Sequence, residues 1–221
     1  MVKVYITDVS GLPDPKDNPE LLNGLSPKRK DKIVRYRKEK DRKQSLGAGY
    51  LLKSCLDEYG INIEDIYYGE NGKPEIEGVY FNLSHSFNKV VCVISDKPIG
   101  CDIEKIGELK EKIAERFFTN SENEHLNRFS GDEKTDEFYR LWTMKESYMK
   151  MTGEGMSLPL DRVEFVFDSN IKVYRDKQLC DCIITEYEVP GYKLTICAED
   201  KEIGTEIIQV KMDLSCTEHV I

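Results

Sequence analysis

Three acidic side chains have the types and spacing expected of ligands for a divalent cation. Asp102 and Glu104 flank a single residue in the segment GCDIEK, and Glu146 follows later, in LWTMKES. Residues two apart on a strand share one face, about 7 Å apart, and a helix packed on that strand would add Glu146. Two carboxylates about 4 Å apart repel by roughly 4 kcal/mol at an effective dielectric near 20. Such a cluster requires a cation, and oxygen donors without His or Cys suit Mg²⁺.

Each part of this predicted site also has an ordinary interpretation. A strand with a solvated outer face would account for Asp102 and Glu104, although Gly100 just before them permits close backbone approach. Glu146 and Lys150 lie four residues apart on the predicted helix, where an exposed pair contributes only about 0.3–0.5 kcal/mol. Beside a metal-bound phosphate, Lys150 would instead neutralise a phosphate oxygen or the leaving group.

Two short segments supply further candidates for contacts with an anion. NGKPEI places Lys73 before Pro74, after an Asn-Gly pair that is frequent in turns. FNLSHS places His85 between Ser84 and Ser86 in a predicted hairpin, and two hydroxyls beside an imidazole suit a phosphate. An ordinary turn and an incidental histidine are the alternatives for these segments.

The elements that must position these residues alternate between strand-like and helical patterns. Alternating apolar residues predict a strand at the N-terminus, a hairpin around FNLSHS and a short strand over IGCDIEKI. Helical spacing predicts helices over 42–59, 109–118 and 135–151, and SPKRKDK has the Ser and Pro that begin another helix. The last third is strand-like and contains a second hairpin, through EVPGYK.

The two predicted hairpins resemble each other. KVVCVISD and KLTICAED each run from a Lys through an apolar stretch with a Cys to an acidic end, and helical segments precede both. We therefore predict an α+β fold of two similar α/β halves, residues 1–104 and 105–221, each a small sheet with antiparallel strands packed against helices. A chance match of two hairpins is the alternative.

Composition argues against several classes of protein. Charged residues make up 33% of the chain, and no apolar run approaches the roughly 20 residues that span a bilayer. The N-terminus lacks the long apolar core of a secretory signal. Seven Cys without a CxxC pair argue against a zinc site or a disulfide framework. We therefore expect a cytoplasmic protein without membrane association.

The net charge of −9 is unevenly distributed. Residues 28–43 carry ten Lys or Arg and three acids, a local charge of +7 that leaves −16 for the rest. One basic helix on an acidic chain indicates a local anionic ligand rather than a nucleic-acid-binding surface. A solvated helix face accounts for most of these charges equally well.

Five segments, in this order, resemble the Sfp-type 4′-phosphopantetheinyl transferases: SPKRKDK, GKP, FNLSHS, IGCDIEKI and FYRLWTMKESYMK. The pattern DIE followed by WTMKES is the most specific part of this resemblance. It implies an enzyme that transfers the 4′-phosphopantetheine arm of coenzyme A to a serine of an acyl or peptidyl carrier protein. Such enzymes require Mg²⁺, release adenosine 3′,5′-bisphosphate, and bind coenzyme A between two similar halves.

The resemblance also implies roles for individual residues. Asp102, Glu104 and Glu146 would bind the metal, and Lys150 would contact the pyrophosphate. Glu122, in TNSENE, matches an acid proposed to help deprotonate the carrier serine, and Glu146 acting through water is the alternative base. The implied coenzyme A contacts are Arg29 and His85 on the 3′-phosphate with Lys32 nearby, Ser45 and Lys73 as further contacts, and Ser84 and Pro74 on the adenine side.

One position departs from the family pattern, and two other functions stay open. Some members carry a third acid where this chain has Ile103, so water would complete the metal shell. A Mg²⁺-dependent nucleotide pyrophosphate hydrolase would use the same carboxylates with water in place of the carrier serine. A nucleic-acid module would use the basic helix, but the acidity of the remaining chain disfavours it. We expect a monomer, and the residues do not distinguish fatty-acid, polyketide and nonribosomal-peptide carriers.

Overall fold

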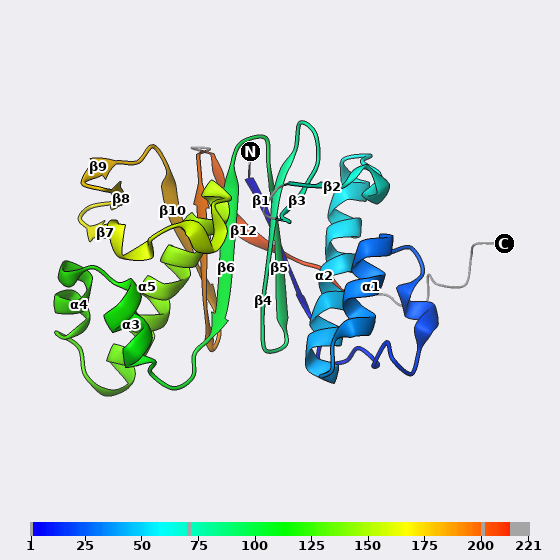
Figure 1. Cartoon of the computed structure of the whole chain (residues 1–221), viewed down its shortest axis with the longest axis horizontal. Helices are drawn as coiled ribbons and strands as arrows, with labels where there is room; N and C mark the ends of the chain where they lie inside the picture. The colour runs from blue at the N-terminus through cyan, green and yellow to red at the C-terminus, as the bar shows by residue number, and fades with distance from the viewer. Residues whose placement is uncertain (1, 70–71, 200–201, 213–221) are drawn as a thin grey trace.

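The structure, a computed structural model, describes residues 2–69, 72–199 and 202–212 and has a mixed α+β fold (Figure 1). A strand, a long helix and a hairpin occur twice along the chain. The first set is β1 (Val2–Asp8), α2 (Glu39–Glu58), β4 (Tyr80–Ser86) and β5 (Lys89–Ser95). The second set is β6 (Ile99–Lys105), α5 (Gly131–Thr152), β10 (Ile183–Val189) and β11 (Tyr192–Ala198).

Both sets build the same antiparallel arrangement of strands. In the first set β5 lies between β1 and β4, and in the second set β11 lies between β6 and β10. The similar segments KVVCVISD and KLTICAED therefore contain the two equivalent central strands, β5 and β11. The α+β fold of two similar halves that the hairpins predict is confirmed.

Shorter elements connect and extend the two sets. They are α1 (Pro27–Arg35), α3 (Glu111–Phe117), α4 (Asn120–Leu126), β2 (Tyr67–Tyr68), β3 (Pro74–Glu75), β7 (Val163–Phe167), β8 (Ile171–Arg175), β9 (Gln178–Leu179) and β12 (Ile203–Gln209), with 3₁₀ turns at Pro19–Leu22, Ile63–Asp65, Gly155–Ser157 and Leu160–Arg162. Pro27 occupies the start of α1, as expected. The helix predicted from residue 135 begins earlier, at Gly131, and ends at Gly153, whose φ of 74° is left-handed.

The sheets do not divide at the predicted boundary between residues 104 and 105. That boundary falls within β6, which pairs with β11 and so belongs to the second sheet. Conversely, β12, from the C-terminal part of the chain, pairs in parallel with β1 and completes the sheet β12-β1-β5-β4 of the first half. The division from the sequence is corrected accordingly, because strand pairing between distant segments decides the halves.

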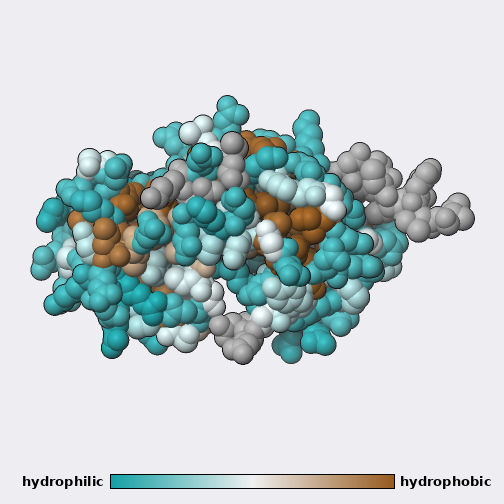
Figure 2. Space-filling model, turned by 90° about the horizontal axis from the view of Figure 1, so that it is seen from above, coloured by the Kyte–Doolittle hydropathy of each residue, from teal (hydrophilic) through white to brown (hydrophobic). Residues whose placement is uncertain are grey.

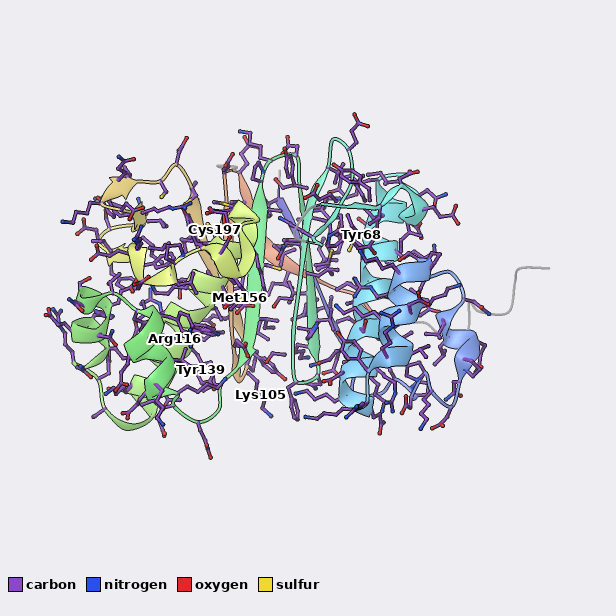
Figure 3. All side chains as sticks on the ribbon, in the orientation of Figure 1. Tyr68, Lys105, Arg116, Tyr139, Met156 and Cys197 are labelled. Atoms are coloured by element: carbon purple, nitrogen blue, oxygen red, sulfur yellow. The ribbon has the colours of Figure 1, made fainter. Side chains whose placement is uncertain are left out.

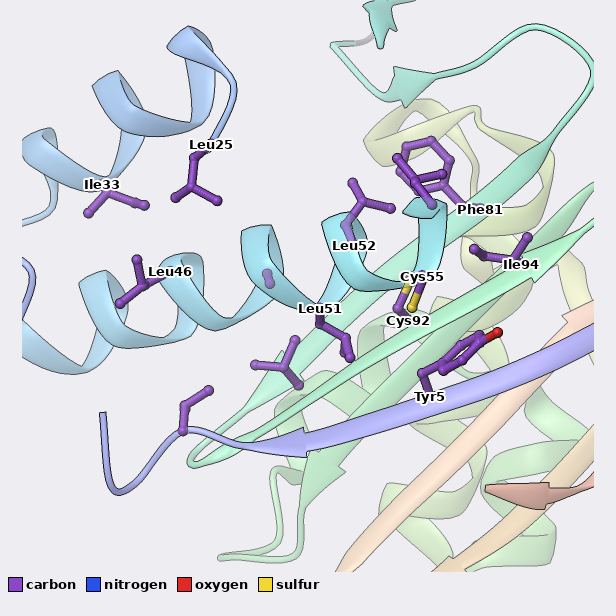
Figure 4. Packing of buried hydrophobic residues seen from close by; sticks show 14 of the residues in the cluster. Tyr5, Leu25, Ile33, Leu46, Leu51, Leu52, Cys55, Phe81, Cys92 and Ile94 are labelled. Atoms are coloured by element: carbon purple, nitrogen blue, oxygen red, sulfur yellow. The ribbon is translucent and has the colours of Figure 1, made fainter. Parts of the chain in front are cut away.

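The layers run helix, sheet, sheet, helix across the molecule (Figure 1). Tyr5, Cys92 and Ile94 face α2, where they pack on Leu51 and Cys55 (Figure 4). The opposite faces of β1 and β5 pack on the apolar faces of β6 and β11 in a second buried cluster. The outer face of the second sheet packs on α5.

The surface seen from above in the frame of Figure 1 is mainly hydrophilic, with apolar residues in a few patches (Figure 2). Among the described helices, none has the length and apolar character needed to cross a membrane. The described cysteines are free, and Cys55, Cys92, Cys101 and Cys197 are buried, as expected for reduced core residues.

Candidate active site

The edge strands of the two sheets, β4 and β6, are joined by side chains where a continuous sheet would have backbone hydrogen bonds. N–H groups of β6 donate to side chains of β4: Cys101 to Asn82 at 3.1 Å, Ile103 to Ser84 at 3.2 Å, and Lys105 to Ser86 at 3.0 Å. The partners advance together by two residues, so the strands run parallel. We call these three contacts the side-chain ladder.

The same two serines also hold the two predicted metal ligands of β6. The Ser84 hydroxyl donates to Asp102 Oδ1 and the Ser86 hydroxyl donates to Glu104 Oε2, each at 2.8 Å. Asp102 is only 4% exposed, and its other oxygen, Oδ2, has no hydrogen-bond partner among the described residues. An unpaired buried carboxylate oxygen is costly, so this atom is suited to binding a cation.

Gly100 allows α5 to approach β6 at backbone distance. A Cβ at this position would lie 2.1 Å from the Ser147 carbonyl oxygen and 2.4 Å from the Met151 nitrogen. The close approach predicted from Gly100 is therefore present. It sets Glu146 and Lys150, which are half-buried on α5, opposite the carboxylates of β6.

Lys150 lies within the acidic cluster. Its ammonium donates to Asp102 Oδ1 at 2.6 Å and to Ser84 Oγ at 3.0 Å. Desolvation lowers the pKa of Lys150, but Asp102, Cys101 and Glu146 together outweigh it and the net shift is upward. Lys73 approaches from the first half and donates to the Lys150 carbonyl at 2.9 Å.

The carboxylates interact electrostatically. Burial, and then the negative charges of Asp102 and Glu104, raise the pKa of Glu146 to about 7 despite the opposing effect of Lys150. Burial and Asp102 likewise raise the pKa of Glu104. Ionising all three together is therefore unfavourable without added positive charge.

This donor set fits a divalent cation although it is not closed around one. Across the described part of the chain, no three Asp, Glu, His or Cys side chains stand as a formed metal-binding group. The Asp102 charge nevertheless raises the pKa of both Glu104 and Glu146, and Asp102 Oδ2 is unpaired. Oxygen donors of this kind suit Mg²⁺.

A second group of charges, all positive, lies on the side of the first half. Desolvation, and then the charges of Lys150, Lys32 and Arg29, lower the pKa of His85 to about 4, although the residue is exposed by its accessible surface. Desolvation also lowers the pKa of half-buried Arg29. No carboxylate of the described residues forms an ion pair with Arg29. A group of positive charges that depresses a histidine pKa is the property expected of an anion site.

The remaining expected contacts surround this region unevenly. Lys73 and Pro74 line a cleft of about 380 Å³, to which the second half contributes Met151 and Thr152. Ser45 is 2% exposed, and its buried hydroxyl has no partner among the described residues. Ser84 is 5% exposed, with its hydroxyl committed to Asp102, so it faces the acidic cluster.

Glu122 does not have the environment of a base for the carrier serine, which corrects that expectation. The residue is 1% exposed and lies in the capping box at the start of α4. Its carboxylate accepts from the N–H groups of Thr119 and Phe165 at 2.8 and 3.0 Å and forms a 2.7 Å ion pair with Lys145. Lys145 in turn donates to the Leu160 carbonyl. Glu122 is thus a buried structural residue.

The sequence interpretation missed Asn82 and the positioning role of Ser86. The sequence predicts a turn from Ser84 to Asn88, but β4 continues to Ser86, so Asn82, Ser84 and Ser86 occupy every second position of one strand and share one face. Three polar residues on one face of a strand with apolar neighbours indicate that this face meets polar groups.

Comparison with known proteins identifies similar chains. Residues 98–197, which include Asp102, Glu104 and Glu146, match the family model of the 4′-phosphopantetheinyl transferase superfamily. The chain is 35% identical to 4′-phosphopantetheinyl transferase Sfp of Bacillus subtilis (strain 168), over 90% of this chain and 92% of that protein. It is 36% identical to 4′-phosphopantetheinyl transferase gsp of Aneurinibacillus migulanus, over 80% of this chain and 78% of that protein. It is 31% identical to 4′-phosphopantetheinyl transferase psf-1 of Bacillus pumilus, over 80% of this chain and 79% of that protein.

Proposed function

The chain belongs to the 4′-phosphopantetheinyl transferase superfamily, and from this premise we propose how its residues transfer the 4′-phosphopantetheine group of coenzyme A to a serine of an apo carrier protein. The observation that carries the assignment of residues is the convergence of two oppositely charged groups. Asp102, Glu104 and Glu146 gather on β6 and α5, and Lys150 links them to His85, which lies near Arg29 and Lys32 of the first half. A diphosphate with a bound cation is complementary to both.

The residues that would hold Mg²⁺ are Asp102, Glu104 and Glu146. The unpaired Asp102 oxygen and the raised pKa of Glu146 support this assignment. When bound, the ion neutralises charge on the diphosphate oxygens. Lys150, already in contact with Asp102, would supply a further positive charge to the diphosphate.

The remaining side chains would bind and orient coenzyme A. Arg29 and His85, with Lys32 nearby, would hold the 3′-phosphate, because a phosphate would offset the positive charges around His85 and favour a proton on its ring. Lys73 and Pro74 would hold the adenine end in the cleft that they line. Ser45 is the weakest member of the proposed set, since only rearrangement would bring its buried hydroxyl to a ligand.

The chemical step breaks the phosphoanhydride bond of the diphosphate and forms a phosphoester bond to serine. The carrier serine oxygen bonds to the phosphorus that bears the pantetheine arm, and the bond from that phosphorus to the bridging oxygen breaks. Adenosine 3′,5′-bisphosphate leaves with that oxygen. Such reactions depend mainly on positioning and on neutralising charge. Since Glu122 is buried in an ion pair, Glu146 acting through water is the better candidate to take the serine proton.

The experiment that tests the function mixes the protein with coenzyme A, Mg²⁺ and an apo carrier protein, and then weighs the intact carrier. We expect a gain of one phosphopantetheinyl group and release of adenosine 3′,5′-bisphosphate. The hydrolase alternative predicts rapid breakdown of coenzyme A without any carrier, and that result would reject the transferase. A cytoplasmic location, a monomeric state and the absence of nucleic-acid and membrane partners stay predictions.

The pKa of His85 gives a test of the 3′-phosphate site. Because its pKa is lowered to about 4, the ring is neutral at pH 7 in the free protein. A bound phosphate favours the protonated ring and raises this pKa, so coenzyme A affinity should increase as the pH falls below 7. NMR titration of the ring should show a midpoint near 4 that moves upward with coenzyme A.

Two comparisons make this prediction specific. Dephospho-coenzyme A, which lacks the 3′-phosphate, should leave the His85 midpoint almost unchanged. His85→Ala should weaken coenzyme A binding roughly tenfold and have little effect on dephospho-coenzyme A. An equal upward movement of the midpoint with both ligands would place the 3′-phosphate elsewhere.

Ser86 should act as a positioning residue for Glu104, because its hydroxyl donates to that carboxylate while it accepts the Lys105 N–H. Ser86→Ala should weaken metal binding by roughly ten- to a hundredfold with little change in the KM for coenzyme A. Mn²⁺ titration of the free protein by electron paramagnetic resonance measures this directly. Ser86→Thr, which keeps the hydroxyl, should restore most of the affinity, and equal Mn²⁺ binding by Ser86→Ala would contradict the role.

A further inference from the structure

Phe87 stands at the tip of the β4–β5 hairpin in a conformation that disfavours its side chain. The hairpin loop has two residues, Phe87 and Asn88, because Ser86 pairs with Lys89. Phe87 has a φ of 53°, whereas Asn88 is not among the residues with positive φ. This is the pattern of a type II′ turn, whose first central position normally holds Gly. A bulky aromatic residue there is strained.

The surrounding structure holds the hairpin tip in this conformation. The Gln44 side chain donates to the Phe87 carbonyl at 2.8 Å. The Asn88 side chain donates to Asp8 at 2.8 Å and accepts from the Tyr192 hydroxyl of the second half. Despite this support, the Phe87 ring is 48% exposed. A strained and exposed aromatic residue on a fixed loop is a feature of functional surfaces.

Two lysines from different halves point at this ring. Lys105 Nζ, from the end of β6, lies 3.5 Å from the ring centroid, and Lys40 Nζ, from α2, lies 5.5 Å from it. Neither lysine forms an ion pair with a carboxylate of the described residues. The ring borders a groove of about 320 Å³ whose acidic lining residue, Glu39, is paired with Lys43. The patch is therefore apolar at its centre and positive at its rim on a chain of net charge −9.

The patch adjoins the acidic cluster through consecutive residues of two strands. Phe87 follows Ser86, whose hydroxyl binds Glu104, and Lys105 follows Glu104. Figure 3 shows Lys105 at one end of β6, and the cleft that Lys73 lines includes Pro98, just before the other end of this strand. β6 thus leads from Ile99 near that cleft, past Asp102 and Glu104, to Lys105 and the patch. A macromolecule seated on the patch would lie next to the proposed reacting centre, at the end opposite the proposed adenine site.

We propose that Phe87, Lys40 and Lys105 form a docking surface for the apo carrier protein, through a segment that presents carboxylates around an apolar side chain. This inference rests on the proposed function, because only the carrier must bring its serine to the acidic cluster. Phe87 would fill an apolar depression of the carrier, and the two lysines would meet its carboxylates. Rim charges of this kind mainly accelerate association and fix register.

The variant Phe87→Gly separates docking from folding. Glycine suits a positive φ, so this variant should melt at the same or a higher temperature than the wild type. The KM for the carrier, and the Kd for the carrier measured without coenzyme A or metal, should rise roughly tenfold. Turnover at saturating carrier and the KM for coenzyme A should be unchanged. Lys105→Glu should give a similar loss that shrinks as salt is added.

Matched controls lie on the far side of the second half. Leu179 is 64% exposed on β9, and Leu179→Gly should leave the carrier KM unchanged. Lys177→Glu should control for the change of charge. An unchanged carrier KM in Phe87→Gly would overturn the proposal. A lower melting temperature with a raised KM for coenzyme A would also overturn it, since Phe87 would then be structural.

The remaining outcomes are equally decisive. If Phe87→Gly alters the mass of the protein in solution, the patch joins copies of this chain and the proposal fails. If the wild type modifies no carrier, the proposed function itself fails. That result appears in the wild-type measurement, before any variant is compared, so the two failures are distinguishable.

Discussion

Glu146→Gln is expected to reduce phosphopantetheinyl transfer by roughly a hundred- to a thousandfold, a loss typical of removing one charged contact in a catalytic site. The substitution keeps the size of the side chain and removes a charge that faces Asp102 and Glu104. The rate at which an apo carrier gains mass measures the effect, and Mn²⁺ titration of the free protein should show weaker binding.

The fold should survive this substitution. The pKa of Glu146 is raised to about 7 by burial and by neighbouring carboxylates, so its charged form is unfavourable in the metal-free protein. The melting temperature of Glu146→Gln without metal should therefore be equal to or above that of the wild type. Glu133→Gln, in the first turn of the same helix, is the matched control and should leave transfer unchanged. A Glu146→Gln enzyme that modifies carriers at the wild-type rate would show that the metal assignment is wrong.

Glu122→Ala should lower the free energy of unfolding by about 3–5 kcal/mol, the usual cost of removing one partner of a buried ion pair. Lys145 is 0% exposed and Glu122 is 1% exposed, so the remaining ammonium would be left without its counter-charge. The Thr119 and Phe165 N–H groups would also lose their acceptor. Urea unfolding measures the loss.

A double substitution distinguishes a structural role from a chemical one. Glu122→Leu combined with Lys145→Met removes both charges and should be less destabilised than Glu122→Ala alone. If this double variant folds, it should keep most of its transfer activity, because neither side chain is open to the carrier. A folded variant of wild-type stability without activity would restore Glu122 as a base.

Local patterns predicted much of the fold and of the site. The hairpins, the duplication and the placement of Glu146 and Lys150 on one helix follow from spacing alone. The close approach of α5 to β6 could also be predicted from Gly100 alone, because a strand without a side chain at one position can meet a helix backbone there.

What the sequence interpretation missed depends on contacts between distant segments or on the second half of a motif. TNSENEH predicts a cap and a helix start, but the part of Glu122 in that cap was not inferred. Thr119 and Glu122 have the T-x-x-E spacing of a capping box, which would have predicted a helix-capping role for Glu122. The boundary between the halves failed for a different reason. Pairing of β6 with β11 and of β12 with β1 is non-local, and alternation along one strand does not indicate its partner.

Because β12 pairs with β1, the first sheet is completed only by residues that are synthesised after β6 to β11. On the ribosome, α2 can fold onto β1, β4 and β5 early, but the outer edge of β1 keeps its free N–H and C=O groups until residues 203–209 emerge. A nascent chain stalled before this point would offer an open strand to chaperones and to other nascent chains. Translation of the last strand thus ends the period of greatest risk of aggregation.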